Sequence, residues 1–477
     1  MVKIAFIGAG GIGFTRGLFS DIMCVPELQD TEFAFTDIDK RRLDMVTQLC
    51  RRQIEGNKLP ARITSTTNRR RALEGADYVF NVVKVGGMEG AELDIKIPLK
   101  YGIDQSIGDT LCMGGIMYGQ RNIPCILDFC KDMREVSSDK VLFLNYANPN
   151  AMNTWAAIKH GKVRTLGLCH GVEHNHRQIA EVLGAKSADE VDIICAGINH
   201  QTWYIRILYK GREISGQELL EAYERHPVYG KGEKVRIDML RRFGYYTTET
   251  SSHVSEYVPW YRKRPVGMRK WIDMSSWLYG ASGVVLGLGN HYRDWFDREF
   301  TNLLKADVTP FSPKTRGLER GSYIIEALET GRLFRSHFNV LNQGCITNLP
   351  DDCIVEVPGY VDRNGINIPR VGDLPLACAA TCSASIHVQR MAVEAAVSGD
   401  VMLLKQAALH DPLTAAVCEP PEIWQMVDEM LVAEAKWLPQ YKHAIAGAKK
   451  RLASEKPLGT RKWKGAAPFK APRKSKK

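Results

Sequence analysis

The chain has 477 residues, 44% of them hydrophobic and 25% charged, which is ordinary for a soluble globular protein. It is too long for one typical compact domain, so we expect two closely joined domains. No apolar run approaches the length of a membrane span, and the opening MVKIAFIGAG lacks the features of a secretion signal. We therefore expect a cytoplasmic protein with no membrane partner.

The net charge of +10 is concentrated near the C-terminal end. Residues 458–477 hold eight basic residues and no acid, so the rest of the chain carries only 10 − 8 = +2. This stretch has little apolar periodicity, and we expect a basic disordered tail over 456–477. We interpret it as a solubilising tail and do not favour nucleic acid as its partner.

Strands and helices alternate along the first part of the sequence. We expect strands over 3–8, 32–36, 77–83, 140–145 and 165–168, and helices over 11–23, about 40–56 and 115–136. This alternation predicts an α/β fold, with a Rossmann-type doubly wound parallel sheet over residues 1–195.

The pattern changes after about residue 195. The segments 191–198 and 202–209 predict a pair of strands, and 385–405 predicts a strong helix. We therefore expect residues 196–455 to form a second, mixed α+β and largely helical domain. The twelve cysteines include no C-x-x-C pair, so we expect most of them to be small buried hydrophobes rather than disulfides.

A glycine-rich turn, GAGGIG at 8–13, joins the first strand to the first helix. Gly8 permits the tight turn, Gly10 lets the backbone approach a pyrophosphate, and Gly13 lets the helix pack closely on the sheet. Gly11 precedes the helix N-terminus, whose N–H groups attract phosphates. Asp37 ends the second strand, 24 residues beyond Gly13, where a ribose-binding carboxylate is expected. The pattern predicts an NAD site, because this carboxylate repels the 2′-phosphate of NADP.

Cys169 and His170 follow the strand at 165–168, and His200 follows the strand at 191–198. Ligands of open α/β sheets bind at the carboxyl ends of strands. A thiolate and an imidazole from adjacent strand ends are able to share one divalent cation and leave positions open for a substrate. A buried cysteine and a satisfied core histidine are the commoner interpretation of such residues.

Eight motifs carry a resemblance to a known family. They are KIAFIGAGGIGFTR near the start, DQSIGDT at 104–110, NYANPNAMNTWA at 145–156, CHGV at 169–172, GINH at 197–200, SEYVPWYRK at 255–263, NLPDDCIVEVP at 348–358 and NGINIPRVGDLP at 364–375. Together they resemble glycoside hydrolase family 4 from residue 1 to about 450, and most closely its α-galactosidase branch.

The resemblance implies an enzyme that hydrolyses α-galactosides (EC 3.2.1.22) and depends on NAD and a divalent metal, usually Mn²⁺. It implies oxidation of the sugar at C3, removal of the C2 proton with help from the metal, departure of the glycosidic oxygen and addition of water. The second domain would then hold substrate, metal and subunit contacts in a homodimer or homotetramer.

The resemblance also assigns roles to individual residues. Cys169 and His200 are the expected metal ligands. His170 is expected to donate a proton to the leaving group, or else to hydrogen-bond the substrate. Asn148 is expected to hold sugar hydroxyls, with Asp109 as a further substrate residue.

Tyr257 is the expected base, because a neighbouring cation lowers the pKa of a phenol. His253, which we also expect on the substrate side, and Glu256 are its rivals for this role.

Two departures from the family pattern leave the sugar open. Gly171 stands where the α-galactosidase branch has Ser, and a Cys-His-Gly form is associated with α-glucuronidases. Tyr118 lies near a position where close relatives have Arg, and loss of that Arg argues against a carboxylated sugar, although Arg262, Lys263 and Arg264 are able to supply charge. The rest of the sequence favours an α-galactoside, with an α-glucuronide or α-glucoside as alternatives. An NAD-dependent 2-hydroxyacid dehydrogenase is the alternative from another class, and it would need no metal.

Overall fold

The computed structural model describes residues 1–273, 280–292 and 294–465. The strands are β1 (Lys3–Ile7), β2 (Glu32–Thr36), β3 (Arg62–Thr66), β4 (Tyr78–Asn81), β5 (Leu142–Asn145), β6 (Thr165–Gly167), β7 (Val191–Ile198), β8 (Gln201–Tyr209), β9 (Arg212–Glu213), β10 (Tyr246–Thr247), β11 (Phe334–Leu341), β12 (Ile354–Asp362) and β13 (Gly365–Asn367). The helices are α1 (Ile12–Met23), α2 (Lys40–Gly56), α3 (Arg69–Leu73), α4 (Gly87–Lys100), α5 (Cys112–Val136), α6 (Asn150–Lys159), α7 (Gly171–Val182), α8 (Gly216–Arg225), α9 (Tyr229–Gly232), α10 (Lys234–Phe243), α11 (Ser251–Tyr257), α12 (Pro265–Trp271), α13 (Val284–Tyr292), α14 (Trp295–Lys305), α15 (Arg320–Thr330), α16 (Leu376–Ser398), α17 (Val401–His410), α18 (Pro412–Val417), α19 (Pro420–Ala433) and α20 (Lys442–Ser454).

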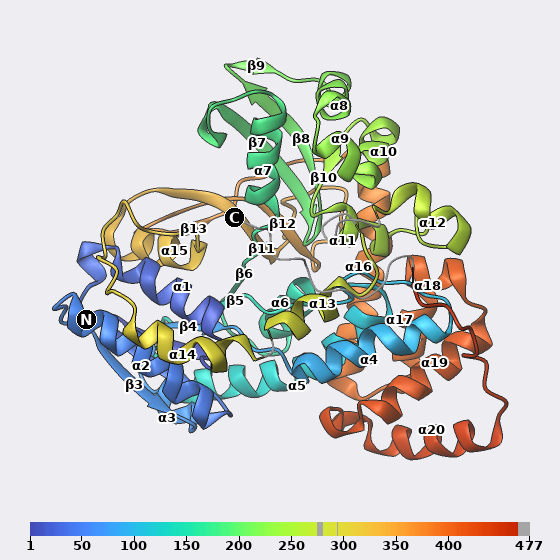
Figure 1. Cartoon of the computed structure of the whole chain (residues 1–477), viewed down its shortest axis with the longest axis horizontal. Coiled ribbons are helices and arrows are strands. Elements are labelled where there is room, and N and C mark those ends of the chain that lie inside the picture. Colours follow the sequence, from blue (N-terminus) through green and yellow to red (C-terminus); the bar gives the residue numbers. More distant parts are fainter. Residues whose placement is uncertain (274–279, 293, 466–477) are drawn as a thin grey trace.

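Six strands form a parallel sheet in the order β3-β2-β1-β4-β5-β6 (Figure 1). This is the strand order of the Rossmann fold. The Phe6 ring of β1 is fully buried and packs on Phe35 and Phe80 of the neighbouring strands, with ring centroids 5.2 and 4.8 Å away. The predicted N-terminal sheet is confirmed, and its short apolar strands suit a sheet that helices cover on both faces.

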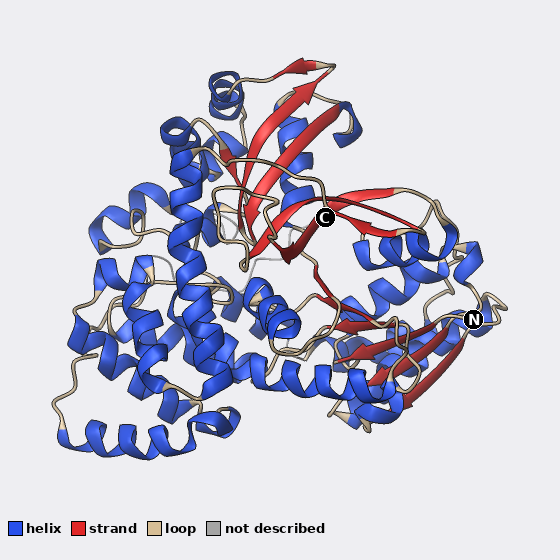
Figure 2. Ribbon diagram, turned by 180° about the vertical axis from the view of Figure 1, so that it is seen from behind, coloured by secondary structure: helices blue, strands red, loops and turns tan. Residues whose placement is uncertain are grey.

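The sheet continues past β6 as β11-β12-β7-β8-β10, with antiparallel pairing. The predicted pair of strands is confirmed as β7 and β8, which extend away from the rest of the sheet beside α8, α9 and α10 (Figures 1 and 2). The long strands β11 and β12 were not predicted.

A narrow junction joins the parallel and antiparallel parts of the sheet. Gly167 of β6 pairs with Asn339 of β11, Asn339 pairs with Glu356 of β12, and Glu356 pairs with Gly197 of β7. The first and last of these pairings involve one residue from each strand. Our expectation that the strands before Cys169 and His200 are neighbours is therefore wrong, because β11 and β12 lie between them.

The predicted helix over 385–405 is two helices. Gly399 has φ of +72° and ends α16, a conformation that glycine adopts without strain. The side chain of Asp400 then accepts the backbone N–H groups of Met402 and Leu403 and caps α17. Helices α16 to α20 gather on the side of the molecule away from the N-terminus (Figure 1).

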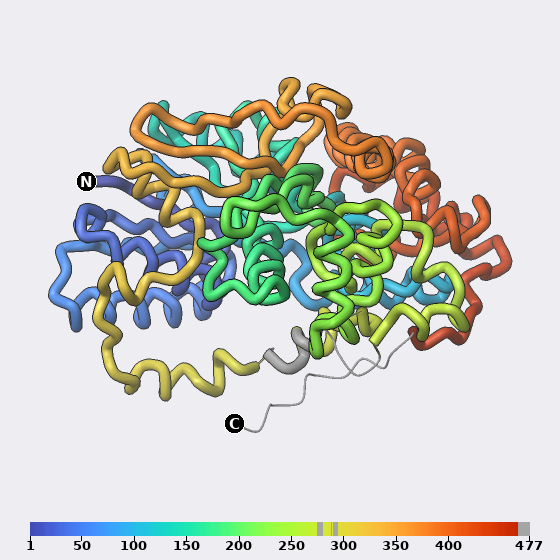
Figure 3. Tube along the Cα trace, turned by 90° about the horizontal axis from the view of Figure 1, so that it is seen from above, coloured from blue at the N-terminus to red at the C-terminus, as the bar shows by residue number. Residues whose placement is uncertain are grey.

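Residues 294–330 return to the first half of the molecule, although they fall in the range expected for the second domain (Figure 3, yellow). Arg41 of α2 forms an ion pair with Asp297 of α14 at 2.8 Å. The backbone N–H groups of Gly317 and Glu319 donate to Asp21 of α1 at 2.7 and 3.0 Å. The domain division at 195 and 196 stays a prediction.

The first residues of the expected disordered tail are in contact with the body of the protein. The N–H of Leu458 donates to Gln425 Oε1 at 2.6 Å, and the N–H of Arg461 donates to the carbonyl of Lys100 at 3.0 Å. Trp463 packs against two buried residues, Met268 of α12 and Ile272, which follows that helix. This part of the expectation is wrong, and residues 466–477 lie outside the described residues.

All twelve cysteines are free and ten of them are buried, which confirms the prediction for this residue type. Within the described part of the chain, we find no helix with the length and apolar character that crossing a bilayer requires.

Candidate active site

The glycine turn after β1 has the backbone geometry that its sequence predicts. Gly8 has φ of +91°, and a Cβ there would lie 3.0 Å from Val83. The Gly10 N–H donates to Asp37 Oδ2 at 2.8 Å, and a Cβ at Gly10 would come within 2.9 Å of the same oxygen. Both positions therefore need glycine, and the turn brings Asp37 against the start of α1.

Gly13 does not have its predicted packing role. No atom lies within 4 Å of the place where a Cβ would stand at Gly13, and both Gly11 and Gly13 are exposed. The N-terminal turn of α1 is consequently open, and N–H groups in a first helical turn have no intrahelical acceptor. This surface suits a phosphate.

Asp37 lies at the edge of this open turn. Its Oδ1 accepts the N–H of Asp39 at 2.9 Å, and a carboxylate retains further acceptor capacity after two such bonds. The neighbouring Ile38 is 99% exposed. A carboxylate beside open apolar surface fits the ribose and base of a nucleotide, so these residues fit NAD.

Cys169 and His200 lie together although their strands are not neighbours. Cys169 Sγ is 3.1 Å from His200 Nε2. His200 has φ of +62° in the tight turn between β7 and β8. The Thr110 hydroxyl donates to Asp109 Oδ1 at 2.7 Å and contacts His200 Nδ1 at 2.9 Å. Because that hydroxyl proton is used, Nδ1–H is the donor to Thr110 Oγ1, and Nε2 is the ring nitrogen that faces the thiol.

Two overlapping groups of side chains among the described residues are able to hold a metal ion. Cys169, His200 and Glu249 form one group, and Asp109, His200 and His253 form the other, each with ligand atoms within 4.8 Å of one another. Thiolate, imidazole and carboxylate are all ligands of divalent cations. The donor set therefore fits the expected divalent metal.

Asp109 and Asn148 lie next to this cluster. Asn148 Nδ2 donates to Asp109 Oδ2 at 2.9 Å. Burial acts to raise the pKa of Asp109, but His253, His200 and the hydrogen bonds to its carboxylate outweigh burial and lower that pKa. The structure thus brings the two predicted substrate residues together, with the carboxylate ionised.

Tyr257 and His253 face each other from successive turns of α11. The Tyr257 hydroxyl donates to His253 Nδ1 at 2.5 Å, and the other ring nitrogen of His253 is 3.7 Å from Glu249 Oε2. Burial raises the pKa of Tyr257 well above its ordinary value. The ring of His253 lies 4.7 Å from that of His200, so both residues belong to the same cluster.

Glu256 points away from the cluster. Its carboxylate is fully buried and accepts the backbone N–H groups of Ser106, Ile107 and Gly108, each at 3.1 Å. Burial raises the pKa of Glu256 to about 8, and hydrogen bonds from the loop act in the opposite direction. Glu256 thus anchors the loop that carries Asp109 and is not placed to act as a base.

His170 contacts the nucleotide side of the site instead of the metal-binding groups. Its Nε2 is 3.0 Å from Glu319 Oε2. Its ring lies 6.0 Å from Phe14 of α1 and 6.1 Å from Tyr146. Its side chain is 47% exposed, so part of the ring is open to solvent.

Three residues of the site were not singled out from the sequence. Thr110 lies within a motif that we quoted, but the motif does not reveal that its hydroxyl orients His200. Glu249 precedes α11 by two residues and reaches the cluster only through the fold. Glu319 is 149 residues from His170, and no local pattern connects them.

Comparison with known proteins agrees with this arrangement. The model of the family 4 glycosyl hydrolases matches residues 3–185, and the model of their C-terminal domain matches residues 195–414. The chain is 58% identical to the α-galactosidase of Rhizobium meliloti (strain 1021) over 465 residues, covering 98% of this chain and 94% of that protein. It is 36% identical to the α-galactosidase of Bacillus subtilis (strain 168), covering 93% and 100%.

A solved structure shares the fold at lower identity. The 6-phospho-β-glucosidase of Thermotoga maritima is 21% identical and superposes with a TM-score of 0.73 over 92% of this chain and 99% of that chain. The fold, the family models and the close relatives lead to one conclusion: the chain belongs to the family 4 glycosyl hydrolases.

Proposed function

We propose that this chain is an NAD- and Mn²⁺-dependent α-galactosidase (EC 3.2.1.22). The observation that carries the proposal is the 58% identity to the α-galactosidase of Rhizobium meliloti over 98% of the chain. The cluster of Cys169, His200 and their acidic neighbours supports it, because a simple dehydrogenase needs no such metal-binding group.

The glycine turn with Asp37 would hold the NAD, and Cys169 and His200 would hold the metal. The 6-phospho-β-glucosidase of Thermotoga maritima contains manganese, NAD⁺ and glucose-6-phosphate, which supports this pair of cofactors. When bound, NAD⁺ supplies a hydride acceptor and Mn²⁺ supplies a Lewis acid for the sugar oxygens.

Tyr257 is the proposed base for the C2 proton. Burial raises the pKa of this phenol, so a neighbouring group has to take its proton first. His253 Nδ1 lies at hydrogen-bond distance from the phenol oxygen, and burial lowers the pKa of His253, so its neutral ring offers a lone pair to that proton. The two residues therefore form a proton relay in our proposal.

Asp109 and Asn148 would bind sugar hydroxyls beside this relay. Their mutual hydrogen bond fixes both side chains, and together they offer acceptor and donor atoms. His170 would donate a proton to the leaving oxygen, with Glu319 orienting its ring through the contact at Nε2.

A neutral sugar suits the charges around the site better than a uronide. Arg262, which the sequence offers as a partner for a carboxylated sugar, is fully buried and forms an ion pair with Asp104 at 3.0 Å. Arg121 is likewise buried between Asp94 and Glu434. These two cations are already neutralised, which favours an α-galactoside over an α-glucuronide.

We also propose that the enzyme acts in the cytoplasm and as a homodimer or homotetramer. Twelve free cysteines suit a reducing compartment. Sedimentation of the purified protein measures its assembly directly.

The experiment that tests the function is hydrolysis of chromogenic α-galactoside, α-glucoside and α-glucuronide substrates. Each is assayed with NAD⁺ and Mn²⁺, with a chelator, and without NAD⁺, and the positive reaction is repeated in D₂O. We expect cleavage of the α-galactoside that needs both additives, with deuterium at C2 of the released sugar. The Cys169→Ala variant should lose this activity and retain NAD binding.

Other results would contradict the proposal in distinct ways. Preferred cleavage of another glycoside would correct the sugar and leave the chemistry in place. Steady NADH formation from a small hydroxy acid, without glycoside cleavage, would favour a dehydrogenase.

A further inference from the structure

We propose that Glu249 is a third protein ligand of the divalent metal, beside Cys169 and His200, and that Gly171 provides the space for it. The inference rests on the proposed function, because it concerns the metal of the same site. The three ligand atoms lie within 4.8 Å of one another.

The first argument is the space at Gly171. A Cβ at this position would lie 2.6 Å from Glu249 Oε1 and 2.8 Å from its Cγ, so any larger residue would displace the carboxylate. Gly171 is the first residue of α7 and is not among the glycines with positive φ. The backbone conformation at this position therefore does not require glycine. The requirement comes from the side chain of Glu249, which occupies the place of a Cβ.

The second argument is charge. The Glu249 side chain is only 17% exposed, and within the described residues its one ion-pair contact is His253 at 3.7 Å. No arginine or lysine of the described chain forms an ion pair with it. A carboxylate in this position is able to bind a divalent cation held between Cys169 and His200.

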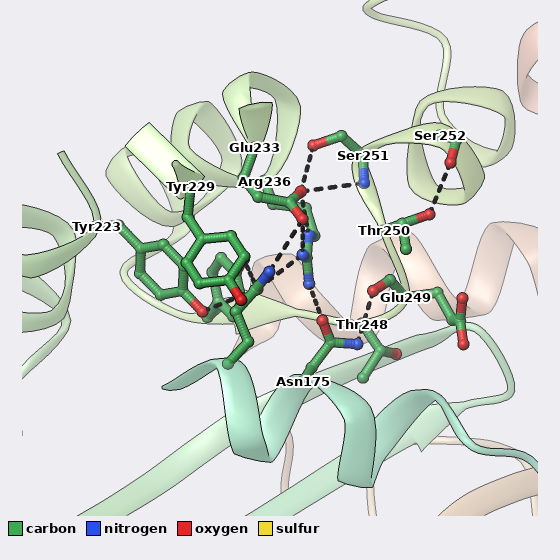
Figure 4. Close-up of polar contacts among 12 residues, drawn as sticks. Asn175, Tyr223, Tyr229, Glu233, Arg236, Thr248, Glu249, Thr250, Ser251 and Ser252 are labelled. Carbon is green, nitrogen blue, oxygen red and sulfur yellow. Dashed lines mark hydrogen bonds and ion pairs between the residues drawn. The ribbon is translucent and has the colours of Figure 1, made fainter. Parts of the chain in front are cut away.

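The third argument is the hydrogen-bond network around Asn175, which lies beside the chain at Glu249 (Figure 4). Asn175 Nδ2 donates to the carbonyl of Gly171 at 2.7 Å and to the carbonyl of Glu249 at 2.6 Å. Arg236 donates to Asn175 Oδ1 and forms a buried ion pair with Glu233. This network joins the two chain segments that carry Cys169 and Glu249, and preorganised segments hold ligand atoms at a fixed separation.

The three ligands also suit the expected ion chemically. A thiolate and a carboxylate carry two negative charges, which would balance a divalent cation, and a histidine binds a metal as the neutral imidazole. The carboxylate adds a hard oxygen donor of the kind that Mn²⁺ prefers. Because Mn²⁺ favours six-coordinate sites, three protein ligands would still leave positions open for the substrate.

The test is a titration of the purified protein with Mn²⁺, in which free Mn²⁺ is measured by electron paramagnetic resonance. Glu249→Gln should raise the Kd for Mn²⁺ at least about tenfold. Gly171→Ser should raise it similarly, because the added side chain occupies the place of the carboxylate. Neither variant should change the affinity for NAD.

A matched control separates ligation from net charge. Glu181 lies on α7 and its carboxylate contacts Tyr229 and His226, away from the cluster. Glu181→Gln removes the same charge and should leave the Kd for Mn²⁺ unchanged. Thermal unfolding with and without Mn²⁺ adds a readout of folding, since a ligand that binds the native state raises the melting temperature. Both test variants should fold and should lose most of the Mn²⁺-induced rise.

The outcomes distinguish this inference from the proposed function. If Cys169→Ala loses Mn²⁺ while Glu249→Gln and Gly171→Ser bind it as tightly as the wild type, the third ligand is refuted and the function stands. If the wild type itself binds no Mn²⁺, both fail.

Discussion

At the scale of single residues, Asp37 connects the glycine turn to the expected cofactor. Its carboxylate accepts the N–H of Gly10 at 2.8 Å and the N–H of Asp39 at 2.9 Å. The same group therefore shapes the turn and presents negative charge where a ribose would bind.

We expect Asp37→Ala to weaken NAD binding about 10- to 100-fold, since a hydrogen bond to a charged group contributes about 1.5–3 kcal/mol. The preference for NAD over NADP should fall as well, because the repelling carboxylate is gone. Fluorescence titration with both nucleotides measures this. Asp44→Ala, which removes an exposed partner of Lys40, is the control, and an unchanged affinity for NAD in Asp37→Ala would contradict the assignment.

Residues whose role follows from local backbone chemistry were predictable from the sequence. Gly8, Gly10 and Asp37 belong to the consecutive elements β1, α1 and β2, and their geometry is as expected. Gly13 was assigned a packing role that depends on what lies opposite the helix, which the sequence does not reveal. Glu249 could not be found because its relation to Cys169 depends on the position of Gly171 across a tertiary contact.

At the scale of elements, the buried pair of Glu233 and Arg236 joins α7, α10 and α11. Burial acts to raise the pKa of Glu233, but Arg236 and other hydrogen-bond donors outweigh burial and lower that pKa. Because the pKa is lower in the folded state than the unfolded value of about 4.3, ionised Glu233 stabilises the fold above that value. This stabilisation is lost as the pH falls through the folded pKa.

We expect Glu233→Gln to be less stable than the wild type by about 3–5 kcal/mol at pH 7, because it leaves Arg236 buried without its partner charge. The difference should begin to narrow as the pH falls below about 4.3, because the unfolded wild type then binds a proton at Glu233 that the folded protein binds only at lower pH. Thermal unfolding of both proteins from pH 7 to pH 3.5 measures the difference. A constant difference over this range would show that the pKa of Glu233 is the same in the folded and the unfolded protein.

Strands that carry polar residues were the hardest elements to predict. β11 and β12 contain buried His337, Asn339 and Glu356, which interrupt the apolar pattern of a strand. Pro358 and Gly359 inside β12 weaken it further. Helices α16 and α17 were predicted as one helix, because the apolar repeat of their sequence continues across the break at Gly399. Period alone identifies an element type, but caps decide where elements end.

At the scale of the whole molecule, the segment after α20 connects distant parts of the surface. It contacts α19 through Gln425, the end of α4 through Lys100, and the region of α12 through Trp463. It therefore links the C-terminal helices to the chain segment that follows α11.

Truncation after residue 455 should lower the melting temperature by roughly 2 °C or more, because about 2 kcal/mol or more of contacts is lost and the unfolding entropy of a chain of 477 residues is about 1 kcal/mol/K. Truncation after residue 465 keeps these contacts and should leave the melting temperature unchanged within about 1 °C. Differential scanning calorimetry of both proteins beside the full chain measures the effect. Equal melting temperatures for all three would mean that the segment contributes nothing to stability.

The alternation of strands and helices was sufficient to predict the parallel half of the molecule, since each unit there is formed by consecutive residues. The return of residues 294–330 to α1 and α2 was not predictable, because it depends on contacts such as that between Arg41 and Asp297. The prediction that Cys169 and His200 lie close together was correct. The argument for it was wrong, because β11 and β12 separate the strands that precede these two residues.

The narrow junction in the sheet has a consequence for the order of synthesis. Cys169 and His200 leave the ribosome early, yet the strands that separate β6 from β7 begin only at Phe334 and end at Asp362. A nascent chain that has not reached this point lacks the central strands that set the distance between thiol and imidazole. The cluster of Cys169 and His200 is therefore completed only after the chain has been synthesised past Asp362.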